Sequence, residues 1–245
     1  MKKYFVVSDV HSFFDEMMEA LNKSGYDKEN PDHIFVSLGD LFDRGKKPKE
    51  CLKFVNSIPF NRKILICGNH ENLAEDIITK GYFSWADVHN GTKETFYLMN
   101  PSAVDDFDAI AKMRDNEIYK KYIRSLELYK EINSYVFVHG WIPCYSRGNA
   151  FYANMGDWRK DASVEWWKEA AWINGMRAWS LYIRDKKTIC CGHWHCSWGN
   201  HYLHDDGEEF GENENFLPFI DDGIIAIDAC TVHTHKVNCI VLEEE

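Results

Sequence analysis

The sequence has no long hydrophobic run and no cluster of basic residues, and both absences exclude classes of function. Apolar runs such as Tyr4 to Val7 and Ile64 to Cys67 are far shorter than the roughly 20 residues that span a bilayer. We therefore expect no membrane partner. The apolar start of the chain ends at Ser8, which is too short for a signal peptide. The net charge is −11, and a binder of nucleic acid duplexes would need a basic face instead.

The cysteines also lack any familiar pattern. There are eight of them, but Cys190 and Cys191 are neighbours and Cys67 lies in an apolar stretch. Secreted disulfide scaffolds are small chains with spaced cysteines. Cys190, Cys191 and Cys196 do not have the spacing of a zinc finger or ribbon. We therefore expect reduced thiols and a cytoplasmic protein.

The first 80 residues alternate between strand and helix patterns. β-branched and aromatic residues predict strands at residues 3–8, 33–37 and 62–67. Apolar residues at helical spacing follow the first strand, and Pro48 opens a second helix. A third helix is predicted at residues 72–80, closed by Gly81. This is a βαβαβ unit. No repeat and no linker rich in Pro, Gly or Ser divides the chain, so residues 1–245 are predicted to form a single domain.

The remainder of the chain is less regular. It predicts a helix at residues 107–129 and strands at 134–138, 187–191, 224–228 and 236–242. Six of the nine tryptophans lie between residues 141 and 185. Such residues usually pack in a core, although their position between two polar motifs makes some of them candidates for the wall of a substrate cleft. His233 and His235 fall in a late predicted strand without an acidic partner, which favours a surface or packing role.

Five short polar motifs follow the predicted strands in a fixed order. They are Asp9-x-His11, Gly39-Asp40-x-x-Asp43-Arg44-Gly45, Gly68-Asn69-His70-Glu71, His139-Gly140 and Gly192-His193-x-His195. Open α/β sheets bind their ligands beyond the carboxyl ends of the strands. The motifs supply carboxylates, an amide and imidazoles, which are the side chains that hold metal ions. Together they indicate metal-assisted hydrolysis of a phosphate ester.

The spacing of these residues fits a pair of metal ions. Asp9 and His11 are two residues apart and would point to the same side of an extended strand end, where they can bind one cation. Asp40 can reach that ion and, through its second oxygen, a neighbouring one. The second ion would be completed by Asn69, His139 and His193. Mixed oxygen and nitrogen ligands suit Mn, Fe or Zn better than Mg. Two such ions about 3.5–4 Å apart can convert a shared water into hydroxide.

The other motif residues have natural roles in the same chemistry. His70 can protonate the departing oxygen as a general acid. Asp43 can orient the imidazole of His70 and stabilise its charged form. Arg44 offers a planar fork for two phosphate oxygens, and Glu71 is expected to cap or anchor the following helix.

With these residues the chain resembles the calcineurin-like metallophosphoesterase superfamily. The run from Gly39 to Gly45, followed by Gly68-Asn69-His70-Glu71, resembles its phosphoprotein phosphatase branch, which includes bacterial and phage Ser/Thr phosphatases and symmetrical dinucleoside tetraphosphatases. The resemblance spans residues 6–195. It implies a mixed α/β (α+β) fold, a four-layer α/β/β/α sandwich of two sheets flanked by helices. It also implies two divalent metal ions, with Mn²⁺ the expected activator in vitro, and substrate binding by Arg44 and Asn69.

The motifs depart from the usual family pattern in three places. Ser8 and Ser12 flank Asp9-Val10-His11 where glycines are usual, and Cys67 replaces an arginine that often precedes Gly-Asn-His-Glu. The last motif is Gly192-His193-Trp194-His195 instead of Gly-His-Thr. Its second histidine resembles the wider superfamily, which implies that His195 ligates the first metal. A second phosphate-binding arginine is expected before this motif, and the candidates are Arg147, Arg159 and Arg177.

We therefore expect a dinuclear phosphoesterase that hydrolyses phosphate monoesters by a metal-bridging hydroxide, in the manner of Ser/Thr protein phosphatases. Its substrate would be a phosphorylated protein or a small phosphate ester. The alternative is hydrolysis of a dinucleoside polyphosphate or another nucleotide. A catalytically inactive binding scaffold is the rival from another class. It is disfavoured because the chain retains every expected ligand and the general acid.

Overall fold

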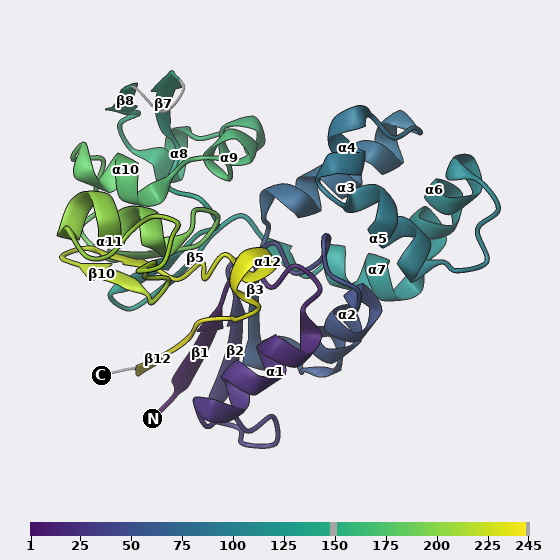
Figure 1. Ribbon diagram of the computed structural model, residues 1–245, viewed down its shortest axis with the longest axis horizontal. Coiled ribbons are helices and arrows are strands. Elements are labelled where there is room, and N and C mark those ends of the chain that lie inside the picture. Colours follow the sequence, from purple (N-terminus) through teal and green to yellow (C-terminus); the bar gives the residue numbers. More distant parts are fainter. Residues whose placement is uncertain (148–150, 244–245) are drawn as a thin grey trace.

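Two five-stranded sheets pack against each other at the centre of the molecule, and helices cover their outer faces (Figure 1). The computed structural model describes residues 1–147 and 151–243. This architecture confirms the predicted mixed α/β class and the sandwich of two sheets flanked by helices. None of the helices within the described residues combines the length and the apolar character that a bilayer span requires.

The first sheet contains the predicted βαβαβ unit. Its strand order is β12 (Cys239–Glu243), β1 (Lys3–Val7), β2 (His33–Ser37), β3 (Lys63–Ile66) and β4 (Leu126–Glu127). Strands β1 to β4 are parallel, and β12 runs antiparallel to β1. The parallel strands are linked by crossovers that contain α1 (Phe14–Lys23) and α2 (Pro48–Ser57). The carboxyl ends of β1, β2 and β3 therefore lie at the same edge of the sheet.

The second sheet brings the later motifs to a common edge in the same way. Its order is β10 (Phe219–Asp221), β11 (Ile224–Ala226), β9 (Thr188–Cys191), β6 (Tyr135–Phe137) and β5 (Lys130–Ile132). The three central strands are parallel, whereas β10 and β5 are antiparallel edge strands. A separate hairpin is formed by β7 (Cys144–Arg147) and β8 (Phe151–Asn154).

The helices divide between the two sheets. Beside the first sheet lie α1, α2, α3 (Asn69–Lys80), α4 (Trp85–His89), α5 (Thr92–Met99), α6 (Asp106–Asp115) and α7 (Glu117–Ile123). Beside the second lie α8 (Trp158–Asp161), α9 (Val164–Ala170), α10 (Gly175–Ser180) and α11 (Cys196–His204). The 3₁₀ turn η1 (Phe60–Arg62) leads into β3, and α12 (Thr231–Thr234) precedes β12 (Figure 1).

Alternating side chains on the strands separate three hydrophobic layers. On β1, Phe5 and Val7 face the helices, whereas Tyr4 and Val6 belong to the layer between the sheets. The second sheet contributes Phe137 to this middle layer, where its side chain is fully buried. Strands that are buried on both faces read as continuous apolar runs. The middle layer fixes one sheet against the other and thereby the loops at their common edge.

Three predicted elements differ from the structure. The helix predicted at residues 107–129 is wrong as a single helix, because the side chain of Asn116 accepts hydrogen bonds from the backbone N–H groups of Ile118 and Tyr119 and starts α7 after α6 has ended. Helix α3 starts at Asn69 rather than at residue 72.

The strand predicted around His233 and His235 is also wrong. This stretch forms the short helix α12, and β12 begins only at Cys239. His233 does have an acidic partner, because its Nε2 lies 2.9 Å from Glu214. The pairing was not visible in the sequence because 19 residues separate the two side chains.

We expect the middle layer to contribute a large share of the stability. Replacing Phe137 with Ala leaves a cavity between the sheets and should lower the free energy of unfolding by about 3–5 kcal/mol. Phe60→Ala is the matched control, because that ring is 77% exposed and its loss should change stability by less than about 0.5 kcal/mol. Urea titrations of both variants would measure the difference. Equal stability of the two variants would contradict the role of the middle layer.

Candidate metal centre

The motif loops from both sheets converge on one cavity of about 140 Å³. Eight of the ten predicted site residues line it, namely Asp9, His11, Asp40, Arg44, Asn69, His70, His193 and His195. The other two lie directly behind the lining. Asp43 contacts His70 at 2.7 Å, and His139 contacts Asn69 at 2.8 Å. The structure thus brings together side chains that are up to 186 positions apart in the sequence.

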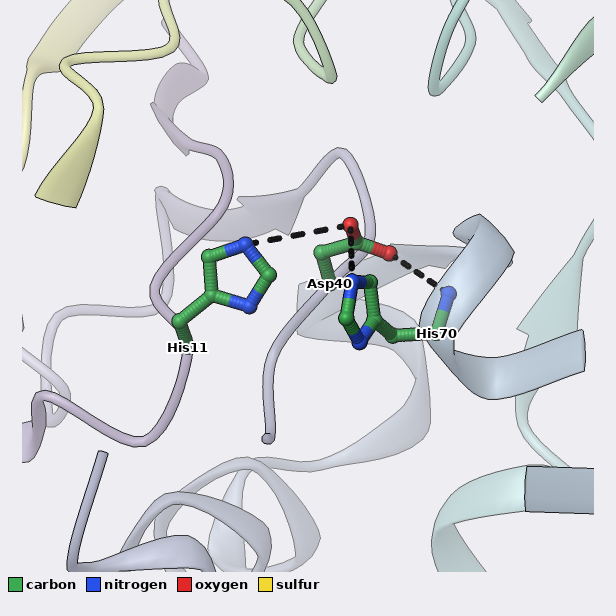
Figure 2. A group of neighbouring side chains, drawn as sticks. All are labelled: His11, Asp40 and His70. Atoms are coloured by element: carbon green, nitrogen blue, oxygen red, sulfur yellow. Dashed lines mark hydrogen bonds and ion pairs between the residues drawn. The ribbon is translucent and has the colours of Figure 1, made fainter. Parts of the chain in front are cut away.

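Asp40 stands between two groups of potential metal ligands. Its Oδ2 lies 3.9 Å from Nε2 of His11 and 3.8 Å from Nε2 of His70 (Figure 2). Its Oδ1 lies 3.4 Å from Nε2 of His139 and accepts a hydrogen bond from the backbone N–H of His70. Within each group, His11–Asp40–His70 and Asp40–His139–His193, one ligand atom per residue lies within 4.8 Å of the others.

Backbone carbonyls orient two of these imidazoles. Nδ1 of His11 lies 3.2 Å from the carbonyl oxygen of Phe42, and Nδ1 of His139 lies 2.7 Å from that of Leu38. Each Nδ1–H can therefore donate to a carbonyl, and in the neutral imidazole, the form that binds metal, this leaves the lone pair of Nε2 on the side of Asp40. Such outer hydrogen bonds are a regular feature of histidine metal ligands.

The protonation states of the histidines also suit a cation. Burial, together with the nearby His70 and Arg44, holds the pKa of His11 well below its usual value. Burial and the neighbouring His139 lower the pKa of His193 to about 3. Both imidazoles are therefore neutral, which is the form that binds metal.

His139 behaves in the opposite way. Burial disfavours its charged form, but the Asp40 carboxylate outweighs burial and raises the pKa of His139 to about 10. A proton on His139 thus supplies the positive charge that the buried carboxylates require. A divalent cation can supply the same charge, so the donor set fits metal ions.

Asp9 is held at the edge of this arrangement. Its Oδ2 accepts hydrogen bonds from the Ser8 hydroxyl and from the backbone N–H of His193, the latter at 2.8 Å. Burial and the charge of Asp40 raise its pKa. A Cβ atom at Gly192 would overlap the Ser8 hydroxyl and the Asp9 carboxylate, which explains the glycine that begins the last motif.

Glu71 connects two of the motif loops. Its Oε2 accepts hydrogen bonds from the backbone N–H groups of Asp40 and Gly68. Its Oε1 accepts one from the backbone N–H of Leu41 and one from the hydroxyl of Tyr122. All four distances are 2.8–3.0 Å. Glu71 thus anchors the start of α3, as expected, and its carboxylate also ties the loop after β2 to the loop after β3. It is fully buried.

The predicted acid and phosphate-binding residues form a connected set. Nδ1 of His70 lies 2.7 Å from Oδ2 of Asp43, which also accepts a hydrogen bond from Thr92. Burial opposes protonation of His70, but Asp40 and Asp43 outweigh it and raise its pKa. The guanidinium of Arg44 lies 3.0 Å from Nε2 of His11 and 3.2 Å from Nε2 of His70, at the mouth of the cavity.

His195 lines the cavity but belongs to neither group of three ligands. Its Nε2 lies 2.9 Å from Glu209, so Nδ1 is the nitrogen left for a metal while that pair persists. None of the three candidate arginines lines the cavity. Arg159 stacks on Trp158 and binds Asp185 at 2.8 and 3.0 Å, which engages its guanidinium elsewhere.

The backbone at the centre adopts a conformation that L-residues rarely occupy. Among the described residues, six that belong to the motifs have positive φ angles between 49° and 75°, namely Asp9, His11, Asp40, Asp43, Arg44 and His193. Left-handed conformations at residues other than glycine are uncommon and cluster at functional sites. At Gly39, with φ of 102°, a Cβ would lie only 2.7 Å from Gly68 and from His139 Nδ1.

Four cavity residues were missed by the sequence analysis, namely Asp228, Cys230, Thr231 and Val232. Asp228 is buried in the lining, and burial together with the charge of Asp9 raises its pKa well above the usual range. Its position just after a strand, which the five motifs share, could have identified it as a site residue. Trp172 also lines the cavity, whereas four other tryptophans of the same segment are buried in the core, namely Trp141, Trp158, Trp167 and Trp179.

Comparison with known families and sequences agrees with this arrangement. The family model described as calcineurin-like phosphoesterase matches residues 2–197. Two curated relatives are symmetrical bis(5′-nucleosyl)-tetraphosphatases. The one from Buchnera aphidicola subsp. Baizongia pistaciae is 41% identical over 71 residues, and the one from Psychromonas ingrahamii is 40% identical over 67. The matches cover 29% and 27% of this chain but only 24% and 23% of the relatives, so the chain matches about a quarter of their length.

Solved structures share the fold at low sequence identity. A putative diadenosine tetraphosphatase has a TM-score of 0.55 with 11% identity, over 98% of this chain and 89% of that one. A cold-active protein tyrosine phosphatase of a psychrophilic Shewanella species has a TM-score of 0.53 with 17% identity, over 100% of this chain and 76% of that one. At such identities these likenesses concern the fold alone.

The link through Glu71 predicts a large stability effect at one position of α3. Glu71→Ala leaves three buried backbone N–H groups without acceptors and should lower the free energy of unfolding by at least about 2 kcal/mol. Glu75→Ala is the matched control, because Glu75 also accepts a tyrosine hydroxyl, that of Tyr119, but touches no motif loop. It should cost less than about 1 kcal/mol. Chemical denaturation measures the free energy of unfolding of both variants. Similar losses of stability in the two would rule out the link between the loops through Glu71.

Proposed function

Since the chain belongs to the calcineurin-like phosphoesterase family and is therefore a metal-dependent phosphoesterase, we propose that two divalent ions share Asp40 and that the substrate is a dinucleoside polyphosphate. The observation that carries the metal centre is the position of Asp40 between two groups of ligands. We assign Asp9, His11 and Asp40 to one ion. The other ion is assigned to Asp40, Asn69, His139 and His193.

The identity of the ions follows from the donor set. Carboxylate, amide and imidazole donors suit Mn, Fe or Zn better than Mg, and Mn²⁺ is the ion to test first. His195 can join the first site through Nδ1, or through Nε2 once its contact with Glu209 is broken. When bound, such ions lower the pKa of water and neutralise charge on phosphoryl oxygens.

The chain's own residues supply the remaining functions. Arg44 carries a planar guanidinium at the mouth of the cavity, where it can bind two phosphoryl oxygens side by side. Nδ1 of His70 is held by Asp43, so Nε2 is the atom that can carry a proton toward the leaving oxygen. The raised pKa of His70 keeps that proton available near neutral pH.

Two observations support a dinucleoside polyphosphate as substrate. Two sequence relatives bear the name of symmetrical bis(5′-nucleosyl)-tetraphosphatases. The lining of the cavity also includes two apolar side chains, Trp172 and Val232, beside the motif residues that would bind phosphoryl groups, and a base can be placed against them.

A phosphate monoester of a protein is the second candidate. The observation in its favour is the Asp43–His70 pair, because a serine or threonine alkoxide needs a proton in order to leave. A nucleotide leaves from an anhydride as a much weaker base and needs that proton less. The two candidates thus differ in their dependence on His70.

The metal centre can be tested by restoring activity with Mn²⁺ to metal-stripped protein. Diadenosine tetraphosphate, a phosphoserine peptide and p-nitrophenyl phosphate should be compared side by side, and we expect the first to be hydrolysed fastest. Asp40→Asn removes the shared carboxylate charge and should reduce turnover by at least about 10³-fold.

Metal content measured by mass spectrometry separates the possible causes. Two equivalents of Mn²⁺ in the wild type and fewer in Asp40→Asn would support the shared carboxylate. Full metal content and full activity in Asp40→Asn would refute it. Faster hydrolysis of the phosphoserine peptide would favour the second candidate.

The role of His70 is tested by the dependence on the leaving group. His70→Asn should slow hydrolysis of an alkyl phosphate by about 10²–10⁴-fold, the usual contribution of a general acid. It should slow hydrolysis of diadenosine tetraphosphate or p-nitrophenyl phosphate much less, because those leaving groups are weaker bases. The ratio of kcat values for each substrate is the measurement. Equal losses on all three would exclude the acid role.

A further inference from the structure

The lining of the cavity is polar except at one place. Most of its side chains are the carboxylates, imidazoles and amide of the metal centre. Trp172 and Val232 are exceptions, and they remain 48% and 42% exposed. Exposed apolar side chains beside an otherwise polar, buried site mark a surface that a ligand can cover.

Trp172 is fixed in position relative to the metal centre. Its backbone N–H donates to the carbonyl of Glu169 at the end of α9, and its backbone has a hydrogen bond with the ring of His193. The indole ring lies 5.7 Å from the His193 ring at an angle of 83°. The indole therefore lies beside His193, one of the candidate metal ligands.

The indole of Trp172 also differs from those of the buried tryptophans. Trp141, Trp158 and Trp179 donate their indole N–H groups to Ile183, Asp185 and Asp222. Among the described residues, the Trp172 N–H has no such partner, which is also true of the buried Trp167, but nearly half of the surface of Trp172 is open. This exposure, which the buried tryptophans lack, leaves the Trp172 ring open to contact with a ligand.

We infer that Trp172 is a specificity-determining residue that stacks on the nucleobase next to the phosphate chain, with Val232 as a second apolar contact. Trp172 and Val232 line the same cavity as the side chains of the metal centre, so the part of the substrate adjoining the bound phosphates lies beside them. Aromatic side chains stack on any base because every base has a π-face. The inference rests on the proposed function and names the part of the substrate that the motifs do not contact.

Binding of ADP and of pyrophosphate to the Mn²⁺-loaded protein tests the inference. Both ligands present a diphosphate to the ions, but only ADP carries a base. Trp172→Ala should weaken ADP binding about tenfold, as is typical for the loss of a stacking aromatic residue, and should change pyrophosphate binding less than twofold. Isothermal titration calorimetry gives both values.

Two further variants serve as controls. Trp172→Phe keeps a stacking ring and should retain ADP affinity within about threefold. Trp166→Ala removes a neighbouring tryptophan that packs against Tyr145 and does not line the cavity, so it should change neither affinity. Unchanged ADP affinity in Trp172→Ala would overturn the inference, and so would equal weakening of ADP and pyrophosphate.

The same measurements separate this inference from the proposed substrate. If diadenosine tetraphosphate is not hydrolysed while the phosphoserine peptide is, the proposed substrate is wrong. The ADP titrations still decide the role of Trp172 in that case, because they require no turnover. If diadenosine tetraphosphate is hydrolysed and ADP affinity does not depend on Trp172, the function stands and the stacking contact is wrong.

Discussion

The buried carboxylate of Asp40 is the constraint on which the rest of the site depends. It is only 2% exposed, and burial alone would favour its neutral form. His139 and His70 nevertheless hold its pKa well below the usual range, so the residue is a buried anion. Such an anion needs positive charge close by. The imidazoles supply it through protons, and metal ions can supply it in their place.

The fold meets this requirement through loops and not through strands. Strands β1, β2 and β9 end at the common edge of the two sheets, and the chain then turns through left-handed conformations, among them Asp9, Asp40 and His193, that cost of order 1–3 kcal/mol each. Glu71 holds the loop after β2 to the loop after β3 through three hydrogen bonds from backbone N–H groups. The layer of apolar side chains between the sheets keeps the remaining loops opposite them. Strained turns persist here because the surroundings leave them no alternative position.

Features that depend on local pattern could be predicted from the sequence, and features that depend on long-range contacts could not. Strands β1, β2 and β3 are buried on both faces and therefore read as apolar runs, and the polar residues after them marked the cavity. The break at Asn116 was missed because apolar periodicity continues across it. Asp228 was missed because no motif surrounds it.

The pairs His195–Glu209 and His233–Glu214 were invisible for a different reason. They join segments 14 and 19 residues apart through a loop whose path no local pattern specifies. Whether each predicted site residue performs its assigned role is still a prediction, since position in a shared cavity shows proximity and not chemistry.

The chemistry at phosphorus and the choice of substrate depend on different parts of the chain. The proposed roles of the metal ligands, Arg44 and His70 all concern the phosphorus atom and its oxygens, and the same set of groups would serve an alkyl ester or an anhydride. What differs between such substrates lies beyond the bound phosphoryl group. The exposed apolar residues of the cavity lining come from the segment after α9 and from α12, and neither carries a motif. We therefore expect selection of the substrate to depend on Trp172 and Val232, because they are apolar side chains in the lining that remain open to a ligand.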